Sequence, residues 1–191
     1  MALPGVYKIF NDRWCNQTVW VISDTHFNEE DIKAAFPKRP PDEELVKLIN
    51  FKVGRKDTLL FLGDVGDIEF AKQLRGYKVL VCGNHDVGAT KYEEIFDEIY
   101  TGALIIGEKL ILSHEPVDVP WAFNIHGHDH MGKKRKNHLN VCCDVCGYTP
   151  INLNQFLKSG PSANIQTIHR DAIDRATERK RKRGGKKIGE K

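Results

Sequence analysis

The 191-residue chain has no long apolar run, and this absence excludes several classes of protein. None of its hydrophobic stretches approaches the roughly 18 consecutive apolar residues that a membrane-spanning helix needs. The first residues also lack a basic segment followed by a long apolar one, which is the pattern of a secretory signal peptide. We therefore expect a cytoplasmic protein without a membrane span.

Cysteine is scarce, with five residues in the whole chain. An odd number without the spacing of a disulfide-stapled domain indicates reduced thiols, as in the cytoplasm. Cys142, Cys143 and Cys146 lie together and resemble part of a zinc knuckle. Because no second cysteine pair follows them and the other two cysteines are far upstream, we interpret all three as small buried or half-buried side chains.

No internal repeat is present, and the one low-complexity segment is the end of the chain. Residues 170–191 hold ten Lys/Arg against four Asp/Glu, whereas residues 1–169 hold 19 basic and 22 acidic residues. We predict one mildly acidic domain over 1–169 and a basic, disordered tail over 170–191. Clustered cations release counterions from phosphate backbones, so nucleic acid is a candidate partner of the tail, although no recognition motif accompanies it.

What the sequence does have is a set of short apolar segments that each end in polar side chains. They are 19–23, 58–62, 78–82, 110–113 and 122–125. Their β-branched and aliphatic composition predicts buried strands. The residues that follow them are Asp24 and His26, Asp64 and Asp67, Asn84 to Asp86, His114, and His126 with His128. Layered α/β proteins bind ligands at the carboxyl ends of their strands, so we expect one shared site.

The segments between these strands complete the predicted fold. Helices are expected at 42–52, 68–75, 92–97 and 153–158, a hairpin at 103–112, an edge strand at 7–10, a strand at 139–145, and a helix from about 163 that fades into the tail. The loop 27–41 is expected to shape substrate access. Alternating helices and strands followed by hairpins predict a mixed sheet system covered by helices.

The residues at the strand ends are metal ligands of one chemical kind. Residues i and i+2 of an extended segment point to the same side, so Asp24 and His26 can bind one ion together, and His126 and His128 repeat the spacing. The set mixes carboxylate and imidazole without thiolate, which suits Mn, Fe, Zn, Ni or Co. Asp64 follows a glycine and is placed to bridge two ions. Two divalent ions, two carboxylates and a hydroxide leave a net positive charge that attracts a phosphate ester.

In their order along the chain, these motifs resemble those of the calcineurin-like metallophosphoesterase superfamily. They are Asp24-x-His26, Gly63-Asp64-x-x-Asp67, Gly83-Asn84-His85-Asp86, His114, and Gly127-His128-Asp129-His130 with His126. The resemblance covers roughly residues 18–150 and implies an α/β fold, a four-layer α/β/β/α sandwich of two mixed β-sheets flanked by helices. The chain departs from many small members at Asn28-Glu29, where they have Gly-His, and at Asp129, where threonine or serine is expected.

Carried over residue by residue, the resemblance implies two divalent transition-metal ions, with manganese favoured. Asp24, His26 and His128 would hold one ion, Asn84, His114 and His126 the other, and Asp64 would bridge them. A metal-bridging hydroxide would be the nucleophile, because the ions lower the pKa of bound water. His85 would protonate the leaving alkoxide, and Asp67 or Asp86 would orient neighbouring groups. We interpret His130, His138 and His169 as surface residues, with His130 near the site but not a ligand.

The function implied is a metal-dependent phosphoesterase acting on a small-molecule or nucleotide ester. A phosphodiesterase is favoured over a monoesterase, because no large cap is inserted between the motifs and the metal centre should be open. Two alternatives stay open: a nuclease that holds a polynucleotide with the basic tail, and a catalytically idle scaffold that binds a partner protein. A scaffold would be expected to lose the bridging aspartate or the histidine beside Asn84, but Asp64 and His85 are both present.

Overall fold

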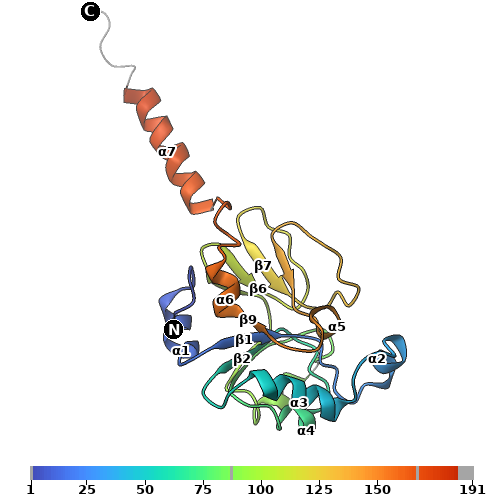
Figure 1. The fold of residues 1–191 in the computed structure, drawn as a ribbon. Coiled ribbons are helices and arrows are strands. Elements are labelled where there is room, and N and C mark those ends of the chain that lie inside the picture. Colours follow the sequence, from blue (N-terminus) through green and yellow to red (C-terminus); the bar gives the residue numbers. More distant parts are fainter. Residues whose placement is uncertain (1, 87, 167, 185–191) are drawn as a thin grey trace, which may run out of the picture.

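The computed structural model describes residues 2–86, 88–166 and 168–184 of the chain. Within them, helices flank two mixed β-sheets (Figure 1). The first sheet has five strands in the order β4-β3-β2-β1-β9, and the second has four in the order β5-β6-β7-β8. The predicted fold class, an α/β sandwich of two mixed sheets flanked by helices, is confirmed.

The first sheet brings three of the predicted strand ends to one edge. Its members are β1 (Val19–Ile22), β2 (Thr58–Phe61), β3 (Tyr77–Val81), β4 (Glu98–Tyr100) and β9 (Ile151–Asn152). The first four run parallel, with Val21 opposite Leu60 and Leu60 opposite Val79, while β9 is antiparallel to β1. Since parallel strands end at the same edge of a sheet, the polar segments that follow β1, β2 and β3 emerge side by side.

The second sheet carries the remaining polar segments. Its strands are β5 (Leu104–Gly107), β6 (Leu110–Leu112), β7 (Phe123–His126) and β8 (His138–Asn140). β5 and β6 form the predicted antiparallel hairpin, while β6, β7 and β8 run parallel. Just beyond β1 and β8 the sheets are joined, because Ser23 N–H donates to Val141 O at 3.1 Å and Cys143 N–H donates to Ser23 O at 3.0 Å. This junction brings the polar ends of both sheets together.

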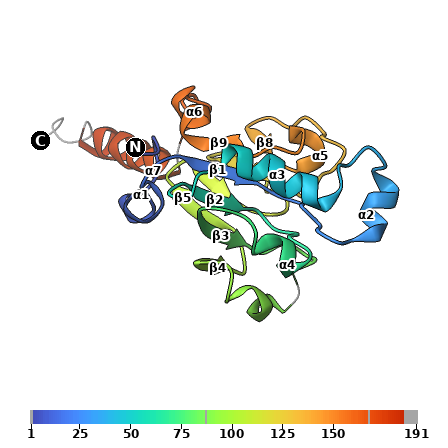
Figure 2. The ribbon, with the colours of Figure 1, turned by 60° about the horizontal axis from the view of Figure 1, so that its bottom comes forward.

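Two apolar layers hold the strands in place. Alternate residues of a strand point to opposite faces, so Val21 and Leu60 are buried between the sheets in one cluster with Leu112 of β6. On the other face of the first sheet lies α3 (Asp42–Lys52), which buries Leu45 (Figure 2). Each such side chain contributes roughly 1.5–3 kcal/mol when fully buried, so these layers fix the strand ends firmly.

The other helices are short, apart from α7. They are α1 (Lys8–Trp14), α2 (Glu30–Ala35), α4 (Ile68–Ala71), the 3-10 turn η1 (Ala89–Tyr92), α5 (Cys143–Cys146), α6 (Leu153–Lys158) and α7 (Ile168–Gly184). Asp67 caps α4 by accepting a hydrogen bond from Glu69 N–H at 2.9 Å. In Figure 1, α7 extends away from the two sheets. Among the described residues, no helix combines the length and the apolar character needed to cross a membrane.

The N-terminal third differs from the prediction in two places. Residues 7–10, predicted as an edge strand, belong instead to α1 and the residue before it. The reason is Asn11, whose Oδ1 accepts from Leu3 N–H at 2.7 Å and whose Nδ2 donates to Val6 O at 2.9 Å, which folds the lead-in back on itself. The loop 27–41, predicted without regular structure, contains the short helix α2. The helices predicted at 42–52 and 153–158 are confirmed.

Two later elements also differ. The helix predicted at 92–97 is not formed: η1 ends at Tyr92, residues 93–97 are turns and irregular chain, and β4 begins at Glu98. The strand predicted over 139–145 ends at Asn140, because Asn140 Oδ1 accepts from Cys142 N–H at 2.9 Å and the chain continues as α5. Cys142 and Cys143 are buried and Cys146 is partly buried, as their interpretation predicted.

The last segment was predicted to be a disordered tail over 170–191. The helix predicted from about 163 to fade into that tail corresponds to α7, which runs to Gly184, and residues 185–191 lie outside the described residues. The division of the chain into a domain over 1–169 and a separate tail stays a prediction.

Candidate metal centre

The backbone turns sharply at the strand ends that carry predicted ligands. Asp24, His26, Asp64 and His128 have left-handed backbone angles, with φ values of 58°, 41°, 53° and 64°. Residues other than glycine rarely adopt this conformation, which stores about 1–3 kcal/mol each and is concentrated at functional sites. We interpret these turns as the means by which the loops after β1, β2 and β7 direct their polar side chains to one place.

Two glycines of the predicted motifs make room for these side chains. A Cβ atom on Gly83 would collide with the Asp64 carboxylate and would lie 2.8 Å from His114 Nδ1. A Cβ atom on Gly127 would collide with the Asp24 carboxylate. Because only glycine permits such close approach, these residues are required by the packing of the site.

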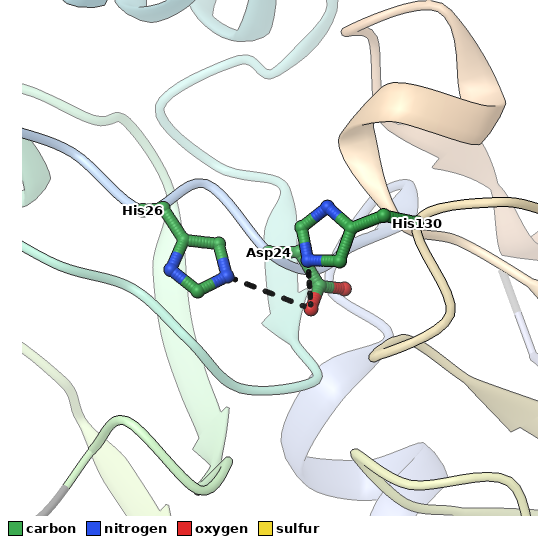
Figure 3. Close-up of side chains that lie close together, drawn as sticks. All are labelled: Asp24, His26 and His130. Atoms are coloured by element: carbon green, nitrogen blue, oxygen red, sulfur yellow. Dashed lines mark ion pairs between the residues drawn. The ribbon is translucent and has the colours of Figure 1, made fainter. Parts of the chain in front are cut away.

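One group of candidate ligands surrounds Asp24 (Figure 3). The Nε2 atoms of His26 and His130 lie 3.9 Å and 3.6 Å from Asp24 Oδ1, so both imidazoles approach the same carboxylate oxygen. His26 is almost fully buried, and its Nε2 has no hydrogen-bond partner. Burial lowers the pKa of His26, although Glu29, Asp64 and Asp24 act in the opposite direction. Leaving a buried nitrogen unpaired costs about 1–3 kcal/mol, so this orphaned atom fits a metal ligand.

A second group consists of His114, His128, Asn84 and Asp64. His114 Nε2 lies 2.9 Å from Asn84 Oδ1, 3.1 Å from His128 Nδ1 and 3.3 Å from Asp64 Oδ2. Burial lowers the pKa of His114, but the nearby carboxylates of Asp64 and Asp24 outweigh that effect and raise the pKa above its usual value. Imidazole nitrogens, an amide oxygen and a carboxylate oxygen therefore converge on one point, where the negative charge of the carboxylates favours a cation. A divalent metal ion would supply that charge.

Asp64, a member of the second group, also reaches the first. Its Oδ2 is 3.5 Å from His26 Nε2 in the first group and 3.3 Å from His114 Nε2 in the second. Its Oδ1 accepts a hydrogen bond from His85 N–H at 2.9 Å, which fixes the orientation of the carboxylate. One carboxylate oxygen of Asp64 is therefore within reach of an imidazole from each group.

Side chains outside the two groups orient His130 in the first group. The other ring nitrogen of His130, Nδ1, bonds Asp144 Oδ2 at 2.7 Å. Asp144 in turn accepts from Arg39 Nη1 at 2.9 Å and from the Tyr148 hydroxyl at 3.1 Å. Burial alone would raise the pKa of Asp144, but the His130 hydrogen bond and the Arg39 guanidinium hold it below its usual range. Carboxylates that bind the second nitrogen of a ligating histidine fix its ring and raise its affinity for metal.

The structure divides the histidines differently from the sequence prediction. His128 joins His114 and Asp64 rather than Asp24, and His130, interpreted as a surface residue, joins Asp24 and His26. His126 belongs to neither group: its Nδ1 lies 2.8 Å from Gly127 O, and its ring centroid is 5.2 Å from that of His138.

The reason for the difference is local. His126 is still part of β7 and follows the register of that strand, whereas the chain turns after Gly127. The spacing His128-x-His130, which begins beyond the glycine, repeats the spacing Asp24-x-His26. This repeat is the sequence signal that could have identified His128 and His130 as the candidate ligands. Nothing in the sequence signals Arg39 and Asp144, because they lie 105 residues apart.

The remaining predicted residues support the loops. Asp86 is buried and accepts hydrogen bonds from Asp64 N–H and Gly83 N–H, each at 2.8 Å, so it joins the loop after β2 to the loop after β3. Asp67 caps α4 and accepts from Asn28 Nδ2 at 3.0 Å. The side chain of His85 is about half exposed (48 %) at the edge of the site.

Comparison with known proteins gives a consistent result. The sequence matches the model of the family described as calcineurin-like phosphoesterase over residues 17–171. It is 32% identical over 168 residues to MJ1445, an uncharacterised protein of Methanocaldococcus jannaschii, in an alignment that covers 73% of this chain and 89% of that protein. The structure resembles the crystal structure of AQ665 from Aquifex aeolicus, a protein of unknown function, with a TM-score of 0.63 and 28% identity, covering 74% of this chain and 98% of that one.

The family assignment and the geometry point to the same chemistry. The family implies a hydrolase that uses divalent metal to cleave phosphoesters, and the clusters of histidine and aspartate can hold such metal. This chain belongs to the calcineurin-like phosphoesterase family and is a metal-dependent phosphoesterase.

Proposed function

We propose that this chain is a phosphodiesterase that uses two divalent transition-metal ions, with manganese as the favoured metal. The observation that carries the proposal is the pair of donor groups on either side of Asp64, each within 3.5 Å of its Oδ2 through one imidazole nitrogen. Carboxylate, imidazole and amide oxygen without thiolate are ligands that suit manganese and its neighbours.

The ligand assignment follows the geometry rather than the sequence prediction. Asp24, His26 and His130 would hold one ion, Asn84, His114 and His128 would hold the other, and Asp64 would contribute to both. When bound, two such ions act as Lewis acids toward the phosphoryl group and make water a better nucleophile near neutral pH. The two carboxylates of the set neutralise only part of the charge of two divalent ions, so the site attracts an anionic ester.

His85 is the proposed proton donor to the leaving alkoxide. Its backbone N–H is bonded to Asp64, which ties its position to the ligand set, and its half-exposed ring can reach a substrate. A positioned histidine contributes typically about 10²–10⁴-fold to such a proton transfer.

The experiment that tests this function compares two substrates in the wild type and in His85→Ala. With an alkyl ester as a poor leaving group, turnover should fall by about 10²–10⁴-fold while metal content stays nearly constant. With bis-nitrophenyl phosphate, whose leaving group needs no proton, the loss should be much smaller. Equal losses on both substrates would show that His85 is not the acid, and a metal-loaded wild type without hydrolytic activity would favour the idle scaffold.

The preference for diesters is tested by a substrate panel. Bis-nitrophenyl phosphate, nitrophenyl phosphate, cyclic nucleotides and single-stranded RNA and DNA should be compared with Mn, Ni and Zn. We expect the highest kcat/KM for a diester with manganese. A higher value for nitrophenyl phosphate would identify a monoesterase.

A nuclease is the second candidate, and helix α7 is the observation that favours it. The side chains of residues 175–182 are exposed and include Arg179, Lys180, Arg181 and Lys182. Cations arranged in this way bind phosphate backbones with an affinity that falls steeply with salt. If the chain is a nuclease, replacing Arg179, Lys180 and Arg181 by Gln should raise KM for single-stranded RNA and leave that for bis-nitrophenyl phosphate unchanged.

A further inference from the structure

The carboxylate of Glu29 lies between two imidazole rings of the site. Glu29 Oε2 is 2.7 Å from His26 Nδ1 and 3.4 Å from His85 Nδ1. The two rings meet edge to face, with their centroids 4.9 Å apart and their planes at 87°. One oxygen atom is thus within reach of a proposed metal ligand and of the proposed acid.

For His26, this contact decides which ring nitrogen is available to a cation. A neutral imidazole carries one N–H, and Glu29 can only accept, so the proton of His26 sits on Nδ1. The bare nitrogen is then Nε2, the buried atom without a hydrogen-bond partner that lies between Asp24 and Asp64. Glu29 therefore selects the tautomer that a metal ligand needs.

For His85, the contact orders a ring that solvent would otherwise leave mobile. In the described part of the chain, Glu29 is the side chain that offers a polar partner to the His85 ring, and His85 is about half exposed. Holding Nδ1 against a carboxylate leaves the opposite nitrogen, Nε2, to act on a substrate.

The loop that carries Glu29 is braced on both sides. Phe27 is buried, and its N–H donates to Val65 O at 3.0 Å. Asn28 adopts a left-handed conformation with φ of 61°, and its N–H donates to Asp42 Oδ2 at 3.0 Å. Glu29 N–H then donates to His26 O at 3.2 Å. This tight turn returns the Glu29 side chain over His26, so its placement does not depend on a flexible loop.

We propose that Glu29 is a positioning residue that holds two groups at once: the ligand His26 and the acid His85. The part that concerns His85 rests on the function proposed above, whereas the part that concerns His26 requires only that the site binds metal. Glu29 contacts Nδ1 of each ring, which in His26 is the nitrogen opposite the proposed ligand atom Nε2, so it acts through the two histidines.

The test uses three variants of the full-length protein. Glu29→Ala removes the carboxylate, and Glu29→Gln keeps its length and one acceptor oxygen. Glu30→Gln is the matched control, because Glu30 is the next residue along the chain, is exposed and pairs with Lys33 at 3.0 Å. Circular dichroism and thermal unfolding establish that all variants are folded.

The first measurement is the binding of Mn²⁺ by calorimetry. We expect Glu29→Ala to weaken one of two sites by about 10–100-fold, the usual effect of losing such a partner, and Glu29→Gln to restore much of the affinity. In the Zn²⁺-loaded wild type and Glu30→Gln, proton NMR should show a slowly exchanging His26 Nδ1–H that Glu29→Ala loses. Unchanged affinity and an unchanged Nδ1–H signal in Glu29→Ala would overturn the proposal. If Glu29→Gln retains the Nδ1–H signal of His26 but does not restore the affinity for Mn²⁺, Glu29 is itself a metal ligand and the proposal is wrong.

The second measurement is a double-mutant cycle on the ratio of kcat for an alkyl ester to kcat for bis-nitrophenyl phosphate, at saturating metal. Glu29→Ala should lower this ratio, and adding it to His85→Ala should lower it no further, because both changes disable the same acid. Additive losses would overturn the role toward His85. A wild type that binds two ions and hydrolyses no ester would refute the proposed function, yet the Mn²⁺ and NMR results would still decide the role toward His26.

Discussion

Replacing Arg39 by methionine should destabilise the protein by about 3–5 kcal/mol, because it breaks a buried ion pair at the base of the metal centre. The Arg39 side chain is almost fully buried. Its Nη1 donates to Asp144 at 2.9 Å, and its Nη2 donates to the backbone carbonyls of Asp24 and Thr25 at 2.5 Å and 2.6 Å. The guanidinium therefore fastens α5 to the turn that carries Asp24.

The magnitude follows from what the variant leaves behind. Without Arg39, the buried Asp144 keeps hydrogen bonds from His130 and Tyr148 but loses its charged partner. Removing one member of a buried pair costs about 3–5 kcal/mol. Two carbonyl hydrogen bonds are lost as well, at about 1 kcal/mol each, and the apolar packing of methionine in the same space offsets that loss, so the total stays at about 3–5 kcal/mol.

The chain provides a matched control in an exposed pair. Arg135 Nη1 lies 3.1 Å from Asp118 Oδ2, nearly the same distance, but the two side chains are 31% and 71% exposed. Exposed pairs contribute about 0–1 kcal/mol, so Arg135→Met should change stability little. Urea unfolding of both variants, with and without EDTA, gives the free energies. A loss below about 1 kcal/mol in Arg39→Met, or equal losses in the two variants, would refute the argument from burial.

The other predictions concern the ligands and their surroundings. His130→Ala should reduce metal content toward one ion per chain, whereas His126→Ala should retain both, and elemental analysis distinguishes them; the reverse result would restore the sequence prediction. Gly83→Ala should lose metal and stability together, because its Cβ would collide with the Asp64 carboxylate. Burial alone would raise the pKa values of Asp64 and Asp144, but hydrogen bonds from His114 and His130, respectively, lower them in the folded protein. Their contribution to stability is therefore present above the ordinary carboxyl range and is lost as the pH falls below that range toward the lowered pKa values. Asp144→Asn should therefore flatten the acid limb of the stability profile, measured by urea unfolding between pH 3 and 7; an unchanged slope would contradict this.

The strand framework could be predicted because its signal is local. β2 reads Thr-Leu-Leu-Phe and is buried at every position, and a parallel strand buried on both faces is a continuous apolar run. The polar residues that follow such strands meet at one edge for reasons of topology alone, so Asp24, Asp64 and Asn84 could be expected together. The same logic did not extend to α1, where three hydrogen bonds of Asn11 overrode an apolar pattern typical of a strand.

The proposed ligand set depends on geometry that spacing does not contain. The rule that residues i and i+2 share a side holds within a strand, but a glycine where β7 ends separates His126 from His128. The side chains that contact His26 and His130 could not be predicted either. Glu29 reaches His26 because of a tight turn, and the Arg39–Asp144 pair beside His130 joins segments that only the folded chain brings together.

The most direct test of the account is a crystal structure of the protein soaked with Mn²⁺, with the ions located by anomalous scattering. We expect two peaks roughly 3.5–4 Å apart, the usual spacing of paired catalytic ions. One should lie among Asp24, His26 and His130, the other among Asn84, His114 and His128, with Asp64 contacting both. A single peak, or ions bound away from Asp64, would contradict it.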